Sequence, residues 1–215
     1  MKYLSSLVLV LAGTFTAVPM FAQDAPSAPK PEYPPYSAVL DGYNKVVSTA
    51  DGAKSMYTLY VKSKDGNVYA ELPPNYATKR YFFALTVASG DKYAGLQSGE
   101  MYVYWRRYNN RLALIAPDLD TRATGDPESA SSVNRLFTDS MILNVPIVTI
   151  GPGGGPVIDL DYLLVGKATK FFGPQFRNQE LMGMYKLQKA KAFPLNVELA
   201  FELPTSTGKL SSIHY

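Results

Sequence analysis

The amino-acid sequence predicts a mainly β fold, an antiparallel sandwich or open barrel with two or three peripheral helices. Aromatic residues make up 13% of the 215-residue chain, with 16 Tyr and 10 Phe, and such side chains suit the pleated, half-buried surface of a sheet. Short β-branched and aromatic runs flank turn-forming dipeptides such as Asp65-Gly66 and Asn109-Asn110, which is typical of hairpins. The chain is 47% hydrophobic and 18% charged, so it has enough apolar material for a core and too little charge for disorder.

The N-terminus has the order of a secretory signal peptide over residues 1–22. Lys2 precedes an apolar run, and the small Ala22 then precedes polar residues. The run, of roughly 15 residues, is shorter than the ~20 that span a bilayer, although a retained membrane anchor is the alternative. We therefore expect an exported protein, periplasmic or extracellular, with no stable membrane span after signal cleavage. Residues 23–35 are rich in proline and are predicted to form an extended linker.

Residues 36–90 are predicted to form a small helix-plus-hairpin module. Its first apolar residues recur at the spacing of one helical face, namely Val39, Leu40, Tyr43, Val46 and Val47. Two β-like runs, 56–61 and 68–72, then flank Asp65-Gly66, whose glycine tolerates the positive φ of a tight turn. A third strand is expected over residues 81–88.

Residues 91–215 are predicted to form a β-rich module that continues beyond Tyr215. A hairpin around Asn109-Asn110 is followed by a helix that begins at Asp126-Pro127, because aspartate can cap the first turn and proline suits its first position. The apolar face of this helix is expected to comprise Val133, Leu136, Phe137 and Met141. Residues 171–179 are expected to be irregular, and the strands are placed at 101–108, 111–116, 142–150, 157–160, 181–190, 193–203 and 209–215.

The counts of histidine and cysteine exclude several kinds of catalytic site. His214 is the sole histidine and the chain has no cysteine, whereas a zinc site built by protein needs three or four His, Cys or carboxylate ligands. A cysteine nucleophile is therefore impossible, and a Ser-His-Asp triad could form only around His214. We expect no catalytic, metal-binding or cofactor-binding residue in this chain. The net charge of +3 comes from scattered basic and acidic residues, which argues against nucleic-acid binding.

One aromatic and basic segment is a possible ligand surface, comprising Tyr102, Tyr104, Trp105, Arg106 and Arg107. Tyr and Trp side chains on strands can bind a sugar or a peptide, but they more often pack within the sheet.

Two Asp-x-Asp pairs and a glycine run each allow a functional and a structural interpretation. Asp118 with Asp120, and Asp159 with Asp161, could bind a cation or perform acid/base chemistry, although turns and helix caps are the ordinary uses of such residues. The glycine run at 151–155 lacks the Gly-Lys-Ser/Thr ending of a phosphate-binding loop. A connector is therefore favoured.

Five segments in a fixed order carry a family resemblance. They are Tyr69-Ala70-Glu71-Leu72-Pro73, the region 95–105, Arg111-Leu112-Ala113-Leu114, Pro156-Val157-Ile158-Asp159 and Ala192-Phe193-Pro194-Leu195-Asn196-Val197-Glu198. Together they resemble the N-terminal region of a bacterial family of secreted zinc-dependent metallopeptidases of the metzincin type, in which β-rich modules precede the catalytic domain. The similarity covers about residues 36–215.

The resemblance implies an accessory role without the family's chemistry. The family holds its zinc on a His-Glu-x-x-His-x-x-Gly-x-x-His helix, which one histidine cannot supply, so no catalytic or metal residue carries over and zinc is expected only in an absent catalytic domain. The leading hypothesis is a non-catalytic region of an exported zinc metallopeptidase that helps to fold, shield or dock a C-terminal protease domain. One alternative is a free-standing exported module that binds a glycan or peptide. Another is a small exported hydrolase that uses a carboxylate pair such as Asp118 and Asp120.

Overall fold

The computed structural model describes residues 31–176 and 183–215. Residues Tyr33–Tyr215 form one compact unit. The predicted signal peptide at 1–22 lies outside the described residues, as do most of the predicted linker and the start of the strand predicted at 181–190. Within the described residues, no helix is long and apolar enough to cross a membrane.

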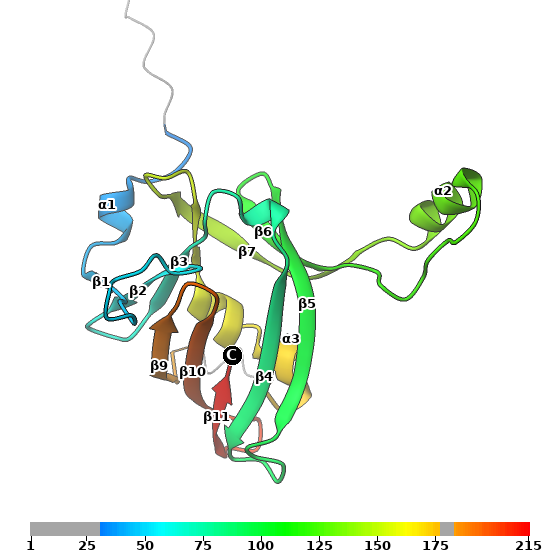
Figure 1. Ribbon diagram of the computed structural model, residues 1–215. Coiled ribbons are helices and arrows are strands. Elements are labelled where there is room, and N and C mark those ends of the chain that lie inside the picture. The colour runs from blue at the N-terminus through cyan, green and yellow to red at the C-terminus, as the bar shows by residue number, and fades with distance from the viewer. Residues whose placement is uncertain (1–30, 177–182) are drawn as a thin grey trace, which may run out of the picture. The chain divides into compact units, whose positions relative to one another are not determined.

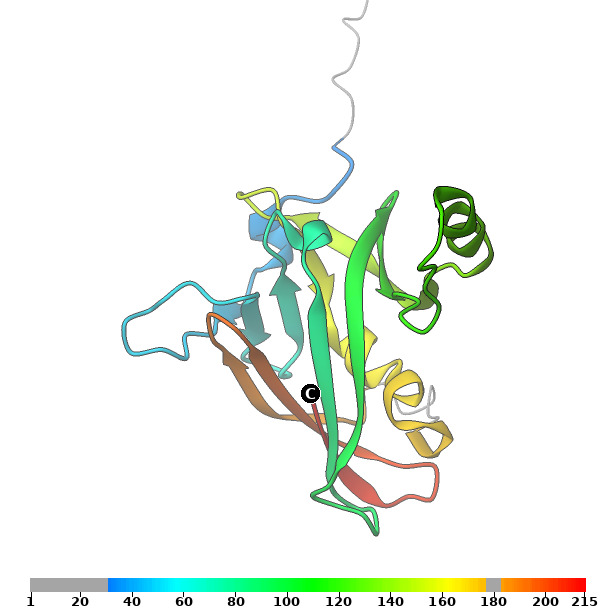
Figure 2. The same cartoon turned by 45° about the vertical axis from the view of Figure 1, so that its right-hand side comes forward.

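The described strands form one antiparallel sheet of eleven strands, in the order β1-β2-β3-β8-β7-β6-β5-β4-β11-β10-β9. The sheet curls but does not close into a barrel, so the predicted mainly β fold is confirmed (Figures 1 and 2). Strands from both predicted modules share it, because β3 pairs with β8 and β4 pairs with β5 and β11. The strands are β1 (Tyr43–Lys45), β2 (Thr58–Lys62), β3 (Val68–Glu71), β4 (Tyr81–Ser89), β5 (Gln97–Tyr108), β6 (Arg111–Ala116), β7 (Ser140–Ile150), β8 (Pro156–Asp159), β9 (Lys186–Ala192), β10 (Val197–Pro204) and β11 (Leu210–His214).

The two predicted hairpins are confirmed. β2 pairs with β3, and β5 pairs with β6, each as an antiparallel neighbour. In their turns Gly66 and Asn109 have positive φ angles of 76° and 51°, a left-handed conformation that Gly and Asn tolerate best. These two pairings therefore follow from local turn chemistry.

The helix predicted over residues 39–47 is wrong beyond Val39. α1 spans only Tyr36–Val39, and the chain then enters β1. Gly42 has a φ of 76°, which turns the backbone out of the helix. The Val46 N–H then donates to the Leu59 carbonyl at 2.9 Å. Cross-strand pairing with β2 thus overrides the helical spacing of the apolar residues.

The helix predicted at Asp126-Pro127 is confirmed as α2 (Pro127–Leu136). One Asp126 carboxylate oxygen accepts the backbone N–H groups of Glu128 and Ser129, each at 2.9 Å, and so satisfies donors that the first turn leaves free. The predicted apolar face is partly wrong, because Met141 lies in β7 and not in the helix.

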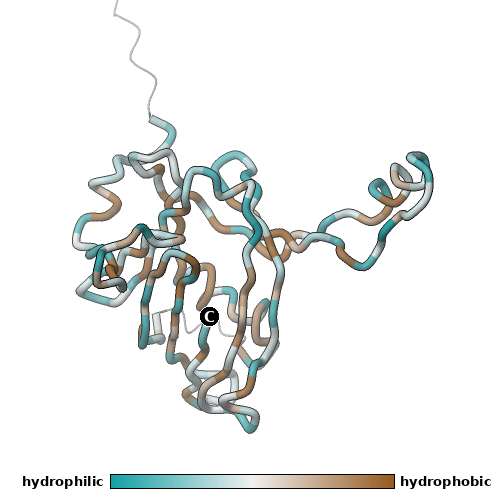
Figure 3. The backbone as a smooth tube through the Cα atoms, viewed as in Figure 1, coloured by the Kyte–Doolittle hydropathy of each residue, from teal (hydrophilic) through white to brown (hydrophobic). Residues whose placement is uncertain are grey.

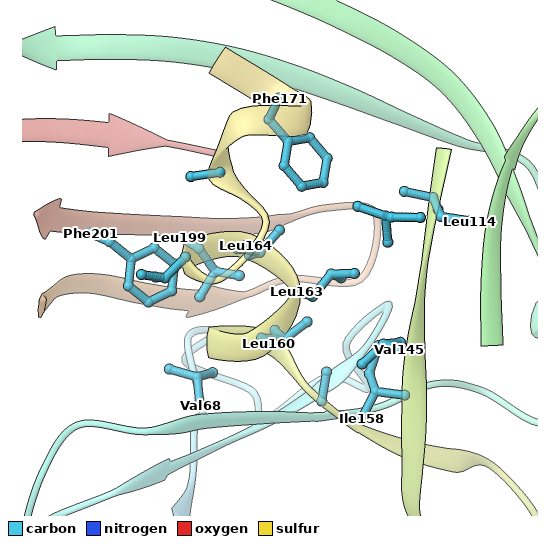
Figure 4. Packing of buried hydrophobic residues seen from close by; sticks show 14 of the residues in the cluster. Val68, Leu114, Val145, Ile158, Leu160, Leu163, Leu164, Phe171, Leu199 and Phe201 are labelled. Atoms are coloured by element: carbon cyan, nitrogen blue, oxygen red, sulfur yellow. The ribbon is translucent and has the colours of Figure 1, made fainter. Parts of the chain in front are cut away.

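Several short helical segments lie against the inner face of the curled sheet or beside it. Irregular structure was expected over residues 171–179, but among those described 171–172 end one helix and 174–176 form a 3-10 turn, so the expectation is wrong there except at Gly173. Figure 4 shows Leu163 and Leu164 near Leu199 of β10, and all three side chains are buried. The segments are the 3-10 turn η1 (Tyr76–Thr78), the π-helix η2 (Asp161–Val165), α3 (Ala168–Phe172) and the 3-10 turn η3 (Pro174–Phe176).

The segment between β1 and β2 ties the two ends of the sheet together. The Met56 N–H donates to the Phe193 carbonyl at 2.8 Å. Ser48 Oγ accepts the N–H of Ala192, also at 2.8 Å. Because Ala192 is the last residue of β9, these bonds hold this edge of the sheet close to the β1–β2 edge (Figure 2).

The connection between β6 and β7 is an arm, residues 117–139, that carries α2 away from the sheet (Figure 1). No residue of α2 is buried, and Leu136 is 73% exposed. Figure 3 shows hydrophobic residues on this arm as well as along the strands. At its base the Asp118 N–H donates to Asp139 Oδ1 at 3.1 Å, so the chain leaves and re-enters the sheet at neighbouring points.

The glycine run forms the turn between β7 and β8 and passes close to the end of β3. A Cβ atom on Gly155 would collide with the Leu72 carbonyl oxygen, whereas one on Gly153 would meet no atom within 4 Å. We expect Gly155→Ala to lower the free energy of unfolding by about 1–3 kcal/mol, as overpacking does. Gly153→Ala should stay within about 0.5 kcal/mol of the parent. Urea denaturation of both variants checks this, and equal effects would contradict it.

Candidate functional site

The five residues of the predicted ligand surface lie on both faces of β5. Successive strand residues point to opposite faces, so Trp105 and Arg107 lie opposite to Tyr102, Tyr104 and Arg106. Tyr102 is 45% exposed, whereas Tyr104 and Trp105 are 5% and 1% exposed. The five residues therefore do not share one surface.

Tyr104 and Arg106 belong to a polar cluster at the base of the arm. The Tyr104 hydroxyl donates to Asp139 Oδ2 at 2.6 Å and accepts from Arg106 Nη2 at 2.8 Å. The Arg80 guanidinium lies over the Tyr104 ring, 4.2 Å from its centroid. The hydrogen bond from Tyr104 holds the pKa of Asp139 below its usual range. These contacts fix the arm, which is a structural role.

Trp105, on the inner face, lines an apolar pocket of about 340 Å³. Its floor includes Leu163 and Leu164 of η2, and its sides come from β4 and β10. A pocket of this size, mostly apolar with few polar groups, is typical of small ligand or side-chain sites. We define it as the β4–β10 pocket.

Three aromatic residues form one wall of the β4–β10 pocket. Trp105 Nε1 donates to the Tyr57 hydroxyl at 3.0 Å, and the Tyr57 and Tyr81 ring centroids are 5.3 Å apart. Within the described residues the buried Tyr81 hydroxyl has no hydrogen-bond partner of good geometry, although the nearby Tyr57 hydroxyl influences its pKa. Burial raises the pKa of both phenols, so both stay protonated at neutral pH. The two phenols therefore interact with each other in the wall of the pocket.

The pocket opens between β4 and β10, beyond the end of β11. Tyr215, which also lines it, is held at this end by a hydrogen bond from its hydroxyl to the Leu164 carbonyl, 2.7 Å long. Phe82, at the mouth, is 62% exposed, and Asn196 and Glu198 add polar groups to the β10 side. The mouth thus combines apolar and polar contacts.

A second, acidic pocket of about 280 Å³ contains the predicted pair Asp159 and Asp161. Asp161 is 2% exposed; its Oδ2 atom accepts the Val68 N–H at 2.7 Å, and the nearby Tyr185 hydroxyl acts to lower its pKa. Burial, reinforced by the charge of Asp159, raises the pKa of Asp161 to about 7. Asp159 Oδ1 accepts the Tyr162 N–H at 2.9 Å, which confirms the predicted capping of the short helix. Among residues 31–176 and 183–215, no group of three His, Cys, Asp or Glu side chains could hold a metal ion.

Hydrogen bonds to residues close in sequence account for the other Asp-x-Asp pair, Asp118 and Asp120, and for His214. Asp118 Oδ1 accepts the N–H groups of Asp120 and Thr121 at 3.1 Å each, which is a turn. His214 Nε2 lies 3.0 Å from Ser212 Oγ within β11, and burial lowers its pKa.

Tyr57 and Tyr81 are not among the site residues predicted from the sequence. The alternation of inward apolar residues along 81–87 could have placed Tyr81 on the inner face of its strand. It could not have shown that β10 lies across from β4, because the two strands are far apart in sequence.

The comparisons with known proteins add no identification. No protein-family model, no curated protein and no solved structure matches this chain.

Proposed function

We propose that this chain is a non-catalytic accessory region of an exported zinc metallopeptidase and that it docks the protease polypeptide at the β4–β10 pocket. The proposal places the chain, after removal of the signal peptide at 1–22, in the periplasm or outside the cell. It leaves zinc and catalysis to the protease domain. It is supported by the ordered resemblance of the five segments and by the shape and chemistry of the pocket.

The observation that carries the docking role is an apolar pocket with an aromatic wall. Burying a Leu, Ile or Phe side chain contributes about 1.5–3 kcal/mol, and the aromatic wall of Trp105 and Tyr57 suits such a group. A sugar, the ligand of the alternative hypothesis, carries hydroxyls that need several polar partners. The pocket therefore favours an apolar side chain of a polypeptide.

The test uses a separately prepared catalytic domain of a secreted zinc metallopeptidase from the same organism. We expect the purified chain to bind this domain in calorimetry and to show no zinc-dependent peptidase activity alone. Ala84, an exposed residue of β4 at the mouth of the pocket, offers a way to block it without disturbing the core. Ala84→Trp should weaken binding about tenfold or more, the effect of losing at least 1.4 kcal/mol.

The matched control is Ala94→Trp, because Ala94 is equally exposed but lies in the β4–β5 connection. This variant should bind as the parent does. The proposal is wrong if the parent chain fails to bind the catalytic domain, if both variants bind equally well, or if the chain alone cuts proteins with bound zinc.

A further inference from the structure

The helix α2 on the arm presents an apolar face that stays exposed within the described residues. Ala130, Val133, Leu136 and Phe137 recur at spacings of three and four residues, so they share one side of the helix. No residue of α2 is buried, and Leu136 and Phe137 are 73% and 47% exposed. A helix of ten residues is marginal in water unless its apolar face packs against something. The arm therefore lacks the contact that would stabilise α2.

A second exposed apolar surface lies on the outer face of the sheet. Phe82 of β4 pairs directly with Tyr102 of β5, and their side chains are 62% and 45% exposed. Met141 of β7 is 59% exposed and pairs with Ile115 of β6, which in turn pairs with Tyr104 of β5. Tyr104 and Ile115 are buried and belong to one small hydrophobic cluster. We define these five residues as the outer patch; exposed apolar patches of this kind mark sites of protein interaction.

Charge distinguishes the arm from the rest of the chain. Residues 117–139 contain five acidic and two basic residues, which gives a net charge of −3. Since the whole chain carries +3, the remainder carries +6. Two basic groups stand at the outer patch, because the Arg80 guanidinium lies over the Tyr104 ring and Arg106 Nη2 donates to the Tyr104 hydroxyl at 2.8 Å. The arm thus complements the outer patch in charge, whereas a surface of anionic lipids would repel it.

The length of α2 matches the width of the outer patch. The patch extends over β4, β5, β6 and β7, which are neighbours in this order. Three inter-strand spacings separate the first strand from the last, or about 14 Å. α2 has ten residues and is about 15 Å long. The helix of one molecule can therefore lie across the whole patch of another.

We propose that the outer patch of a second copy of this chain receives the arm, so that two copies exchange arms and cover the apolar face of α2. Within one chain α2 stands clear of the strands (Figures 1 and 2). The exchange is reciprocal, because each copy carries one arm and one patch. Arm and patch adjoin at Asp139, whose Oδ2 atom accepts the Tyr104 hydroxyl at 2.6 Å. A twofold axis beside this residue can therefore bring both contacts together.

The exchanged surfaces are large enough for a stable dimer. Stable interfaces use about 20–30 residues a side. The arm, residues 117–139, supplies 23 residues, and the outer patch adds to them. The inference does not depend on the proposed function, because its partner is this chain itself.

Sedimentation equilibrium of the purified chain tests the exchange. We expect twice the 23.6 kDa mass of one chain, with a dissociation constant of about 1 μM or tighter, as interfaces of standard size have. Leu136→Ser combined with Phe137→Ser should raise this constant about tenfold or more. The control combines Leu195→Ser with Leu210→Ser, which are 90% and 62% exposed elsewhere, and it should dimerise as the parent does. A parent that stays monomeric about a hundredfold above the expected constant overturns the proposal, as do equal effects of the two double variants.

Mixing two defective variants separates arm-to-patch exchange from pairing of two arms. Tyr102→Ser should also weaken the dimer about tenfold, whereas Tyr93→Ser, at a 62% exposed position in the β4–β5 connection, should not. A mixture of the Leu136/Phe137 variant with Tyr102→Ser restores one of the two contacts, because one intact arm meets one intact patch. We expect this mixed dimer to be about tenfold tighter than the dimer of either variant alone. Pairing of two arms would give no such gain and would contradict the proposal.

Hydrogen exchange supplies a readout on α2 itself. The Val133 amide should exchange about tenfold more slowly in the dimer than in the monomer, because α2 gains packing. Protection that does not change with dimerisation would show that α2 lies outside the interface, and would overturn the proposal.

Two other occupants of the apolar face would give different results. If the chain alone is monomeric and binds phosphatidylcholine vesicles through Leu136 and Phe137, the face belongs to a membrane. If the monomeric chain instead needs these residues to bind the catalytic domain, the face belongs to the protease. Either result overturns the exchange between copies, and the second leaves the accessory function standing. Conversely, a chain that dimerises through its arm but never binds the catalytic domain retains the exchange and loses the proposed function.

Discussion

Trp105→Ala is expected to lower the free energy of unfolding by about 3–5 kcal/mol, the range for removing a buried Trp or Phe. Trp105 is 1% exposed and belongs to the main core cluster. The change also leaves the buried Tyr57 hydroxyl without its donor at 3.0 Å. The effect therefore combines a lost apolar contact, a cavity and an unsatisfied polar group.

Two further variants separate the contributions to this loss of stability. Trp105→Phe keeps an aromatic ring but loses the indole N–H, so it should cost less than Trp105→Ala. Tyr102→Ala removes an aromatic residue of the same strand that is 45% exposed, and it should cost no more than about 1 kcal/mol. Chemical denaturation gives all three values. Similar losses for Trp105→Ala and Tyr102→Ala would show that Trp105 does not support the core.

The stability of the protein should depend on pH through Asp161. Its pKa is raised from 3.8 to about 7 in the folded state, chiefly by burial. Between these values the folded protein binds more protons at this site than the unfolded chain does, so the contribution of Asp161 to stability falls as pH rises from about 4 to 7. At ~1.4 kcal/mol per pKa unit the fall amounts to about 4 kcal/mol at most.

Asp161→Asn isolates that contribution. Asparagine keeps a side-chain oxygen for the Val68 N–H, which Asp161 Oδ2 accepts at 2.7 Å, but it carries no charge at any pH. The stability difference between variant and parent should therefore grow in favour of the variant between pH 4.5 and 8. Urea unfolding across this range measures it, with Asp41→Asn at an exposed position as the control that should show no such trend. A difference that stays constant with pH would mean that Asp161 ionises normally.

Local signals in the sequence predicted the fold well, and long-range pairing limited the rest. Gly66 and Asn109 mark tight turns, and Asp126 caps α2 through its own side chain, so each structure depends on a few adjacent residues. The helix predicted over 39–47 failed because β2 offers the same residues a strand partner. Propensity is a weak guide where tertiary contacts compete.

The candidate site was less predictable than the fold, because it depends on contacts between residues that are far apart in sequence. From the sequence, Trp105 belonged either to a possible ligand surface or to the packing within the sheet, and the structure places it in a pocket wall with Tyr57 and Tyr81. That wall exists only because β5, β4 and the segment before β2 meet. The opposite side comes from β10, which begins at Val197, far later in the chain than β5 and β4. A pattern within a short stretch of sequence cannot predict contacts between strands that are so far apart in the chain.

The arm at 117–139 has a consequence for how this chain can vary. Because Asp118 and Asp139 hold its two ends side by side at 3.1 Å, β6 and β7 would remain a simple hairpin whatever length of chain joined them. The entropy of closing such a loop rises only slowly with its length. Related proteins could therefore lack this arm, or carry a longer or a different one, while every strand of the sheet kept its pairing.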